Sequence, residues 1–129
     1  MFRLKCLIAA ALMACTVSFA AAQNLPAPSE WTNQRTSVLR IFWSYPDGRF
    51  AGTFTNNAPG FSCHATYPMT GTATGNQVAF VVNFWNCQSI TNWSGTIRGN
   101  VMRTRWTLNY IENGTPKTMR GSDTFQRRN

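Results

Sequence analysis

Few side chains of this chain could carry out acid–base, nucleophilic or metal chemistry. The 129 residues include 4 Asp+Glu and one His against 12 Lys+Arg, which gives a formal net charge of +8. Glu30 lies just before the first expected strand, Asp47 and Glu112 fall in turns, and His64 lies in a loop without an obvious partner carboxylate. A Ser-His-Asp arrangement, a carboxylate pair or a metal site would have to come from this small set. We therefore expect neither an enzyme nor a metal site.

Asp123 differs from the other acids because it alone falls inside an expected strand. An isolated carboxylate is very costly to bury, so an inward-facing Asp123 would need a hydrogen-bonding partner. The alternative is a surface carboxylate near the C-terminus. Among the acidic residues, Asp123 is therefore the strongest candidate for a functional role.

The elements that would position these side chains begin after a segment that resembles an export signal. Arg3 and Lys5 precede an apolar run from Cys6 to Phe19, and Ala20-Ala21-Ala22 forms a cleavage site of the A-x-A type. The run is too short for an ordinary membrane-spanning helix and no second apolar span follows. We expect a signal peptide over residues 1–22, a secreted or periplasmic protein, and no integral membrane segment after processing. Lipoprotein anchoring at Cys15 is the alternative.

Signal removal would leave two cysteines, Cys63 and Cys87, and would lower the net charge to +6. Two cysteines in an exported chain are expected to form a disulfide. Closing a loop of this length stabilises a protein by about 3–4 kcal/mol in the chain-entropy model. Two buried free thiols are the alternative.

The remaining chain predicts an all-β fold. Residues 23–30 are Pro-rich and are expected to form a flexible lead-in to a single domain over residues 31–127. Short β-rich runs separated by Asp-Gly, Gly-Asn and Asn-Gly turns indicate sequential antiparallel hairpins. Eight such strands can close into an up-and-down barrel. The expected strands are 31–33, 37–45, 49–56, 66–74, 77–85, 92–98, 101–111 and 117–126.

Alternation along these strands indicates which side chains face inward. Phe50, Phe54 and Asn56 share one face of their strand, and Phe80 and Phe84 share a face of theirs. Apolar walls with a few polar groups are typical of a small-molecule pocket. The same aromatic side chains could instead simply fill a core, and the pattern alone leaves both interpretations open.

Six short motifs, taken in order, resemble the avidin/streptavidin family of biotin-binding barrels. They are Trp31-Thr32-Asn33-Gln34 with Ser37, Gly52-Thr53-Phe54, Thr70-Gly71, Ser89 to Gly95, Trp106-Thr107-Leu108, and Gly121 to Phe125. The cysteine pair and the ending Asp123-Thr124-Phe125-Gln126 resemble the short, dimeric, rhizavidin-like branch. The resemblance covers nearly the whole chain after the signal.

The resemblance implies a ligand, biotin, and a set of residues that bind it without catalysis. Asn33 and Ser37 match donors to the ureido oxygen, whereas Asp123 and Asn56 match acceptors for the ureido N–H groups. Thr91 matches the hydroxyl near the ring sulfur, and Ser89 matches the one that meets the tail carboxylate. The matched walls of the pocket are Trp93, Trp106, Leu108, Phe54 and Phe84.

Two of these wall positions depart from the family pattern. Phe54 stands where other members have a Tyr that donates to the ureido oxygen, and Phe84 stands where the larger proteins have a Trp. A buried hydrogen bond left unmade costs about 1–3 kcal/mol. We therefore expect a specific biotin site that is weaker than the strongest in the family, unless water or Arg35 replaces the missing donor.

The resemblance also bears on assembly. In tetrameric members, a Trp eight residues before the site carboxylate closes the pocket of a neighbouring subunit. Here that position is Thr115, so a homodimer is expected rather than a tetramer with lids of this kind.

Other functions remain as alternatives. One is a small exported barrel that inhibits an enzyme, as lysozyme inhibitors do, or that binds a different cyclic ligand. Another is electrostatic binding to nucleic acid, which the net charge would favour. The basic residues form no dense cluster, so we expect no nucleic-acid partner.

Overall fold

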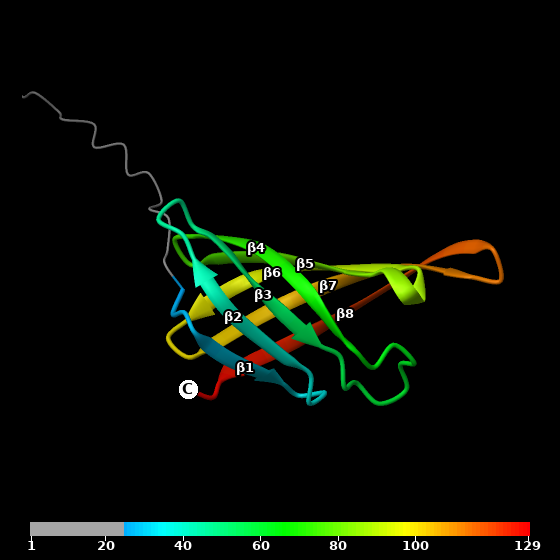
Figure 1. Cartoon of the computed structure of the whole chain (residues 1–129), viewed down its shortest axis with the longest axis horizontal. Coiled ribbons are helices and arrows are strands. Elements are labelled where there is room, and N and C mark those ends of the chain that lie inside the picture. Colours follow the sequence, from blue (N-terminus) through cyan, green and yellow to red (C-terminus); the bar gives the residue numbers. More distant parts are fainter. Residues whose placement is uncertain (1–24) are drawn as a thin grey trace, which may run out of the picture.

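The computed structural model describes residues 25–129 and forms a closed antiparallel barrel of eight strands (Figure 1). Each strand pairs with the next, and β8 returns to pair with β1. This confirms the predicted up-and-down barrel. The expected export signal, residues 1–22, lies outside the described residues. The strands are β1 (Ser29–Asn33), β2 (Val38–Ser44), β3 (Arg49–Thr55), β4 (Thr66–Thr74), β5 (Gln77–Phe84), β6 (Ser89–Arg98), β7 (Val101–Glu112) and β8 (Thr115–Arg127).

The turn residues explain why the strands follow one another as hairpins. Asn113 and Gly114 form the two-residue connection between β7 and β8, since Glu112 pairs with Thr115. Both turn residues have positive φ, 52° and 76°. A two-residue turn with positive φ at both positions matches the right-handed twist of the strands, and Asn-Gly is the sequence that adopts it most readily.

The start of the barrel differs from the sequence prediction. β1 begins at Ser29, two residues earlier than predicted, and the Leu25 side chain is only 2% exposed within the core cluster. The described part of the expected flexible lead-in therefore packs against the barrel. Burial of an apolar side chain from this segment compensates for the entropy lost on ordering it.

The connection between β5 and β6 also differs from the prediction. A short 3₁₀ helix, η1 (Trp85–Cys87), reverses the chain, and Trp85 is exposed instead of ending β5. Gln88 follows in the left-handed region, and β6 then begins at Ser89, three residues earlier than predicted. Ser89 and Thr91 consequently lie on a strand, and alternation puts both on its inner face.

Inward-facing side chains fill the barrel away from its open end. The predicted inward rows on β3 and β5 are confirmed, because Phe50, Phe54, Phe80 and Phe84 are all at most 5% exposed. On the outward row of β7, Arg103 and Arg105 are exposed. The core also contains Trp31, Leu39, Ile41, Tyr67, Met69, Val82, Ile97, Met102 and Phe125.

The β7–β8 hairpin is longer than the other hairpins and projects beyond the barrel (Figure 1). All residues from Ile111 to Arg120 are exposed. Near its tip, the Lys117 ammonium donates to Glu112 Oε1 over 2.9 Å, and this hydrogen bond raises the pKa of Lys117. The hairpin therefore extends one wall of the barrel outward, at the end where the cavity opens.

The predicted disulfide is confirmed. Cys63, in the loop after β3, is bonded to Cys87 at the end of η1, with the two Cα atoms 6.1 Å apart. The bond joins two connections at the same end of the barrel (Figure 1). It therefore fixes part of the rim.

Candidate ligand-binding site

A cavity of about 490 Å³ occupies the end of the barrel where the β1–β2 turn, the β3–β4 loop and the β7–β8 hairpin meet. The sequence predicted eleven ligand-binding residues, and all of them line this one cavity. They are Asn33, Ser37, Phe54, Asn56, Phe84, Ser89, Thr91, Trp93, Trp106, Leu108 and Asp123. The barrel thus brings together residues from six strands or the connections that follow them.

Asn33 is oriented by the turn that it begins. Its Oδ1 accepts the backbone N–H groups of Arg35 and Ser37, each over 3.0 Å. Two N–H donors on one atom identify that atom as the oxygen of the amide. Asn33 is buried, and its NH₂ group remains to donate to a molecule in the cavity.

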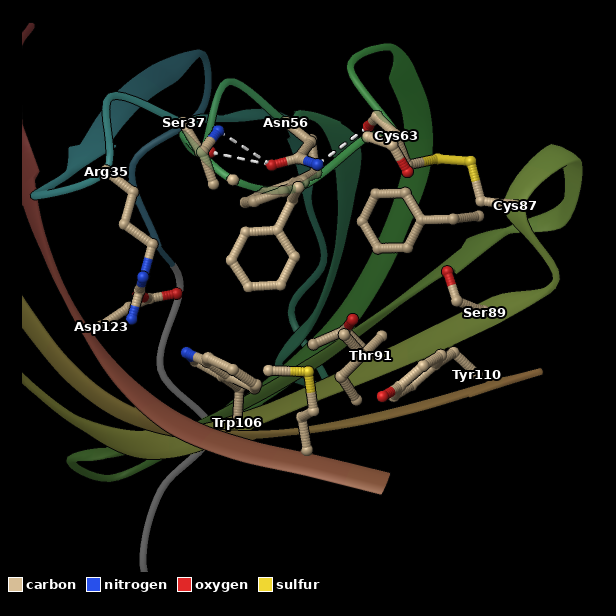
Figure 2. A pocket seen from close by; sticks show the side chains of 18 of the residues that line it. Arg35, Ser37, Asn56, Cys63, Cys87, Ser89, Thr91, Trp106, Tyr110 and Asp123 are labelled. Atoms are coloured by element: carbon tan, nitrogen blue, oxygen red, sulfur yellow. Dashed lines mark hydrogen bonds and ion pairs between the residues drawn. A yellow bond between two sulfur atoms is a disulfide. The ribbon is translucent and has the colours of Figure 1, made fainter. Parts of the chain in front are cut away.

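Ser37 and Asn56 form a second polar group on the adjoining wall (Figure 2). The Ser37 hydroxyl accepts the backbone N–H of Asn57 over 3.0 Å and donates to Asn56 Oδ1 over a long 3.4 Å. Asn56 Nδ2 donates to the carbonyl of Cys63 over 2.8 Å, and its Oδ1 accepts the N–H of Ala58. The long Ser37–Asn56 contact is the weakest of these, so the hydroxyl can turn toward a better acceptor.

Asp123 faces inward and is 4% exposed. An inward-facing carboxylate was expected to need hydrogen-bonding partners, and Asp123 has three. Trp93 Nε1 donates to its Oδ2 over 2.9 Å. Gln34 Nε2 donates to its Oδ1 over 2.9 Å, and Arg35 Nε donates to the same oxygen over 3.1 Å. Buried carboxylates need this kind of compensation for lost solvation.

The sequence left open whether Arg35 replaces the hydrogen-bond donor that Phe54 lacks, and the position of its side chain bears on this. Its guanidinium carbon lies 5.7 Å from the centroid of the Trp106 ring while its Nε bonds to Asp123. Figure 2 shows the Arg35 side chain running along the cavity wall toward these two residues. It is thus placed at Asp123 and not at Asn33 and Ser37, where a replacement donor to a carbonyl oxygen would be needed.

Aromatic rings form the remaining walls. The Trp93 ring stacks on Phe80 with centroids 5.0 Å apart, and Phe54 lies 4.9 Å from Trp93. Gly121 pairs with Trp106 across the β7–β8 ladder, and a Cβ at Gly121 would lie 2.3 Å from the Trp106 ring. The Trp106 ring can therefore occupy this position only because residue 121 has no side chain.

The outer cavity is lined by further residues that were not predicted to bind the ligand, among them Ala58, Phe61, Tyr110 and Met119. Tyr110 continues the inward row of Trp106 and Leu108, so strand alternation is the signal that could have found it. Phe61 and Ala58 lie in the β3–β4 loop, for which alternation gives no information. The pocket is consequently deeper on its loop side than the strands alone would make it.

The arrangement is suited to holding a neutral polar ring between aromatic walls. Amide and hydroxyl donors lie on one side, and a carboxylate lies on the other. Among residues 25–129, no group of three or more His, Cys, Asp or Glu side chains comes together to hold a metal ion. His64 Nε2 donates to the carbonyl of Ala58 over 2.9 Å within the loop. Over the same residues, no helix is long and apolar enough to cross a membrane.

A closed meander with a polar and aromatic cavity at one end defines a ligand-binding barrel. The model of the avidin family matches residues 21–128, and the chain therefore belongs to the avidin family. The chain is 35% identical over 117 residues to afifavidin from Afifella pfennigii. The matched region covers 82% of this chain and 72% of that protein.

Solved structures give the same assignment. A bradavidin2–biotin complex is 48% identical and has a TM-score of 0.76, with 81% of this chain and 99% of that chain covered. A rhizavidin–biotin complex is 35% identical and has a TM-score of 0.74, with 81% and 93% covered. The resemblance to the short rhizavidin-like branch is thereby confirmed.

Proposed function

We propose that this protein is a non-catalytic biotin-binding protein. The observation that carries the proposal is the match between the cavity and a cyclic urea. A urea presents one carbonyl oxygen and two N–H donors, and all of them lose solvation when the ring is buried. The cavity offers donors and acceptors in the corresponding numbers, and relatives of this chain have been solved with biotin bound.

The ureido oxygen would lie between Asn33 and Ser37. The Asn33 amide is already turned with its NH₂ group away from the backbone, and the Ser37 hydroxyl can leave its long contact with Asn56. Both groups are buried, so their hydrogen bonds would not compete with bulk water. Phe54 supplies no third donor.

The ureido N–H groups would face Asp123 and Asn56. An ionised carboxylate only accepts hydrogen bonds, and a charged acceptor makes a stronger bond than a neutral one. When Ser37 turns to the ligand oxygen, Asn56 Oδ1 gains a free lobe for the second N–H. The same movement thus prepares both ends of the urea site.

The rest of the ligand would lie between the aromatic walls and the open end. Trp93, Trp106 and Phe84 would pack on the rings, with Leu108 beside them. Thr91 would lie near the ring sulfur. Ser89 lies beside the Cys63–Cys87 disulfide at the rim (Figure 2). It would donate to the tail carboxylate, so the tail would point toward this rim.

The enzyme-inhibitor alternative has less support. Such a barrel would act through its loops and would fill its interior with side chains. A cavity of about 490 Å³ with buried Asn33, Ser37 and Asp123 on its walls has no purpose in that function. A different cyclic urea or amide remains compatible with the same groups.

The proposal includes export and pairing of two chains. The signal-like residues 1–22, with cleavage after Ala22, would deliver the barrel to an oxidising compartment, in agreement with the disulfide. Thr115 stands where a lid Trp would be needed for a tetramer of the lidded kind, which supports a homodimer.

Thermal unfolding with increasing biotin tests the proposal. A ligand that binds only the native state raises the unfolding temperature progressively with its concentration. We expect this rise in the wild-type protein and in Ser94→Ala, which changes an exposed hydroxyl on the outer face of β6. Asn33→Ala should reduce it strongly. No rise at millimolar biotin would contradict the proposal.

A further inference from the structure

We propose that Arg35 is a latch that covers the ligand site and must move aside when the ligand enters. The inference rests on the proposed function and deepens it, because it concerns entry to the same site. It makes Arg35 a positioning residue that opposes binding. The family motifs gave no role to this position, and the role follows from two contacts of the Arg35 side chain.

The first contact occupies the carboxylate that the ligand would use. Asp123 Oδ1 already accepts from Gln34 Nε2 and Arg35 Nε, and Oδ2 accepts from Trp93 Nε1. A carboxylate has about four sites for hydrogen bonds, two on each oxygen, so Oδ1 has no site left for the ligand while Arg35 is in place and Oδ2 has one. Gln34 is clamped, because it also accepts from the backbone N–H of Thr124 and donates to the carbonyl of Ser122. Arg35 is the donor that can yield.

The second contact covers a wall of the pocket. The guanidinium carbon of Arg35 lies 5.7 Å from the centroid of the Trp106 ring, on the face of the ring. Trp106 lines the cavity beside Leu108, where the ligand rings would pack. The guanidinium is held there by the ring and the carboxylate. It therefore obstructs the ligand's hydrogen bond to Asp123 and its packing on Trp106.

Arg35 has room to open. It lies in the turn between β1 and β2, and its side chain is 36% exposed, whereas Asp123 is 4% exposed. The ion pair with Asp123 is the one hydrogen bond of its guanidinium that we find among residues 25–129. Water would solvate the released guanidinium, and the ureido N–H would take its place on Asp123.

Opening the latch has a measurable cost. At the ordinary strengths of a partly exposed ion pair and of an exposed cation–π contact, losing both would change the affinity by about two- to thirtyfold. Salt weakens the ion pair and so favours the open state. For an uncharged ligand, affinity should therefore rise with ionic strength, which is the reverse of ordinary electrostatic attraction.

The experiment compares Arg35→Ala with Arg40→Ala in titrations with biotin and with uncharged biotin amide. Arg40 is a matched control, because it is paired with Glu30 and does not line the cavity. We expect Arg35→Ala to bind both ligands about two- to thirtyfold more tightly than the wild type, and Arg40→Ala to match the wild type. Biotin amide should bind the wild type more tightly at high salt, and this dependence should vanish in Arg35→Ala.

The outcomes separate this inference from the proposed function. Equal or weaker binding by Arg35→Ala, with the wild type binding biotin, would overturn the latch and leave the biotin site intact. No binding by any of the three proteins would overturn the proposed function, and the latch with it. A crystal structure of the biotin complex gives a second reading: Arg35 displaced from Asp123 supports the latch, and an unchanged ion pair contradicts it.

Discussion

The identity of residue 54 sets how many donors the cavity offers to a ureido oxygen. Asn33 and Ser37 supply two, and the Phe54 ring adds apolar wall against Trp93. We predict that Phe54→Tyr tightens biotin binding by about 5- to 150-fold, because it restores a donor whose absence costs about 1–3 kcal/mol. Calorimetric titration with biotin would measure the change.

The control for this variant is Phe42→Tyr. Phe42 is exposed on β2, outside the cavity, so the added hydroxyl should leave the dissociation constant unchanged. If Phe54→Tyr also left it unchanged, the missing hydroxyl would not be the cause of weaker binding.

The negative charge of Asp123 is a second single-residue feature that affects ligand binding. Asp123→Asn keeps the size of the side chain but turns one acceptor atom into a donor that faces ligand N–H and Trp93 Nε1. A hydrogen bond to a charged group contributes about 1.5–3 kcal/mol, so biotin affinity should fall by about 10-fold or more. Asp47→Asn, at an exposed acid paired with Arg49, is the matched control and should bind biotin as the wild type does. Equal losses in both variants would argue against a direct contact.

The residues of the site were largely predictable, but their contacts were not. The resemblance of the motifs to the avidin family implied the eleven residues, and all of them line the cavity. Strand alternation by itself left both a pocket and a filled core open. The pairing of Arg35 with Asp123 depends on the path of the β1–β2 turn, where Thr36 has a positive φ of 67°. No periodic pattern describes such a turn.

At the scale of elements, the disulfide joins the β3–β4 loop to η1 and so holds two sides of the rim together. It closes a loop with a sequence separation of 24, for which the chain-entropy model gives about 3–4 kcal/mol of stabilisation. We predict that replacing both Cys63 and Cys87 by Ala lowers the free energy of unfolding by about that amount in denaturant titrations. An unchanged midpoint would show that the bond does not contribute to stability.

The β7–β8 ladder carries a second test. Gly121→Ala would place a Cβ 2.3 Å from the Trp106 ring, so the indole must move from its place in the cavity wall. Overpacking of this kind costs about 1–3 kcal/mol, and we expect lower stability together with weaker biotin binding. Ser122→Ala changes the exposed neighbour and should affect neither. Unaltered binding by Gly121→Ala would mean that the Trp106 position is not important.

Turn chemistry explains why most elements were predictable from the sequence. Asn113-Gly114 and the other Gly-containing turns mark hairpins directly, and the strands between them alternate. The β5–β6 connection lacks such a signal, because η1 and the left-handed Gln88 make the reversal. The prediction therefore put Ser89 in a loop, although it lies at the start of β6. Leu25 was missed for a similar reason, since one apolar residue in a Pro-rich segment has no period.

At the scale of the whole molecule, the basic excess lies mainly on the outside of a barrel with its polar site inside. Arg98, Arg103 and Arg105 are exposed, whereas Asp123 is buried. Exposed apolar side chains lie at both ends of the barrel: Trp85, Ile90, Ile111 and Met119 are on elements near the open end, and Phe42, Trp43 and Tyr45 are at the end of β2 and in the β2–β3 turn. Pairing of two copies would remove some of this surface from water.

We predict that sedimentation equilibrium gives twice the mass of the processed chain, because Thr115 provides no lid Trp for the lidded tetramer. A mass of four chains, unaffected by dilution, would contradict this prediction.

If the cavity binds biotin through the groups that complement a urea, isothermal titration of the wild-type protein with biotin will detect it. We predict saturable binding of one biotin per chain, lost in the Asn33→Ala, Ser37→Ala double variant and retained in Ser94→Ala. No binding at millimolar biotin, or binding that the double variant leaves intact, would contradict the account.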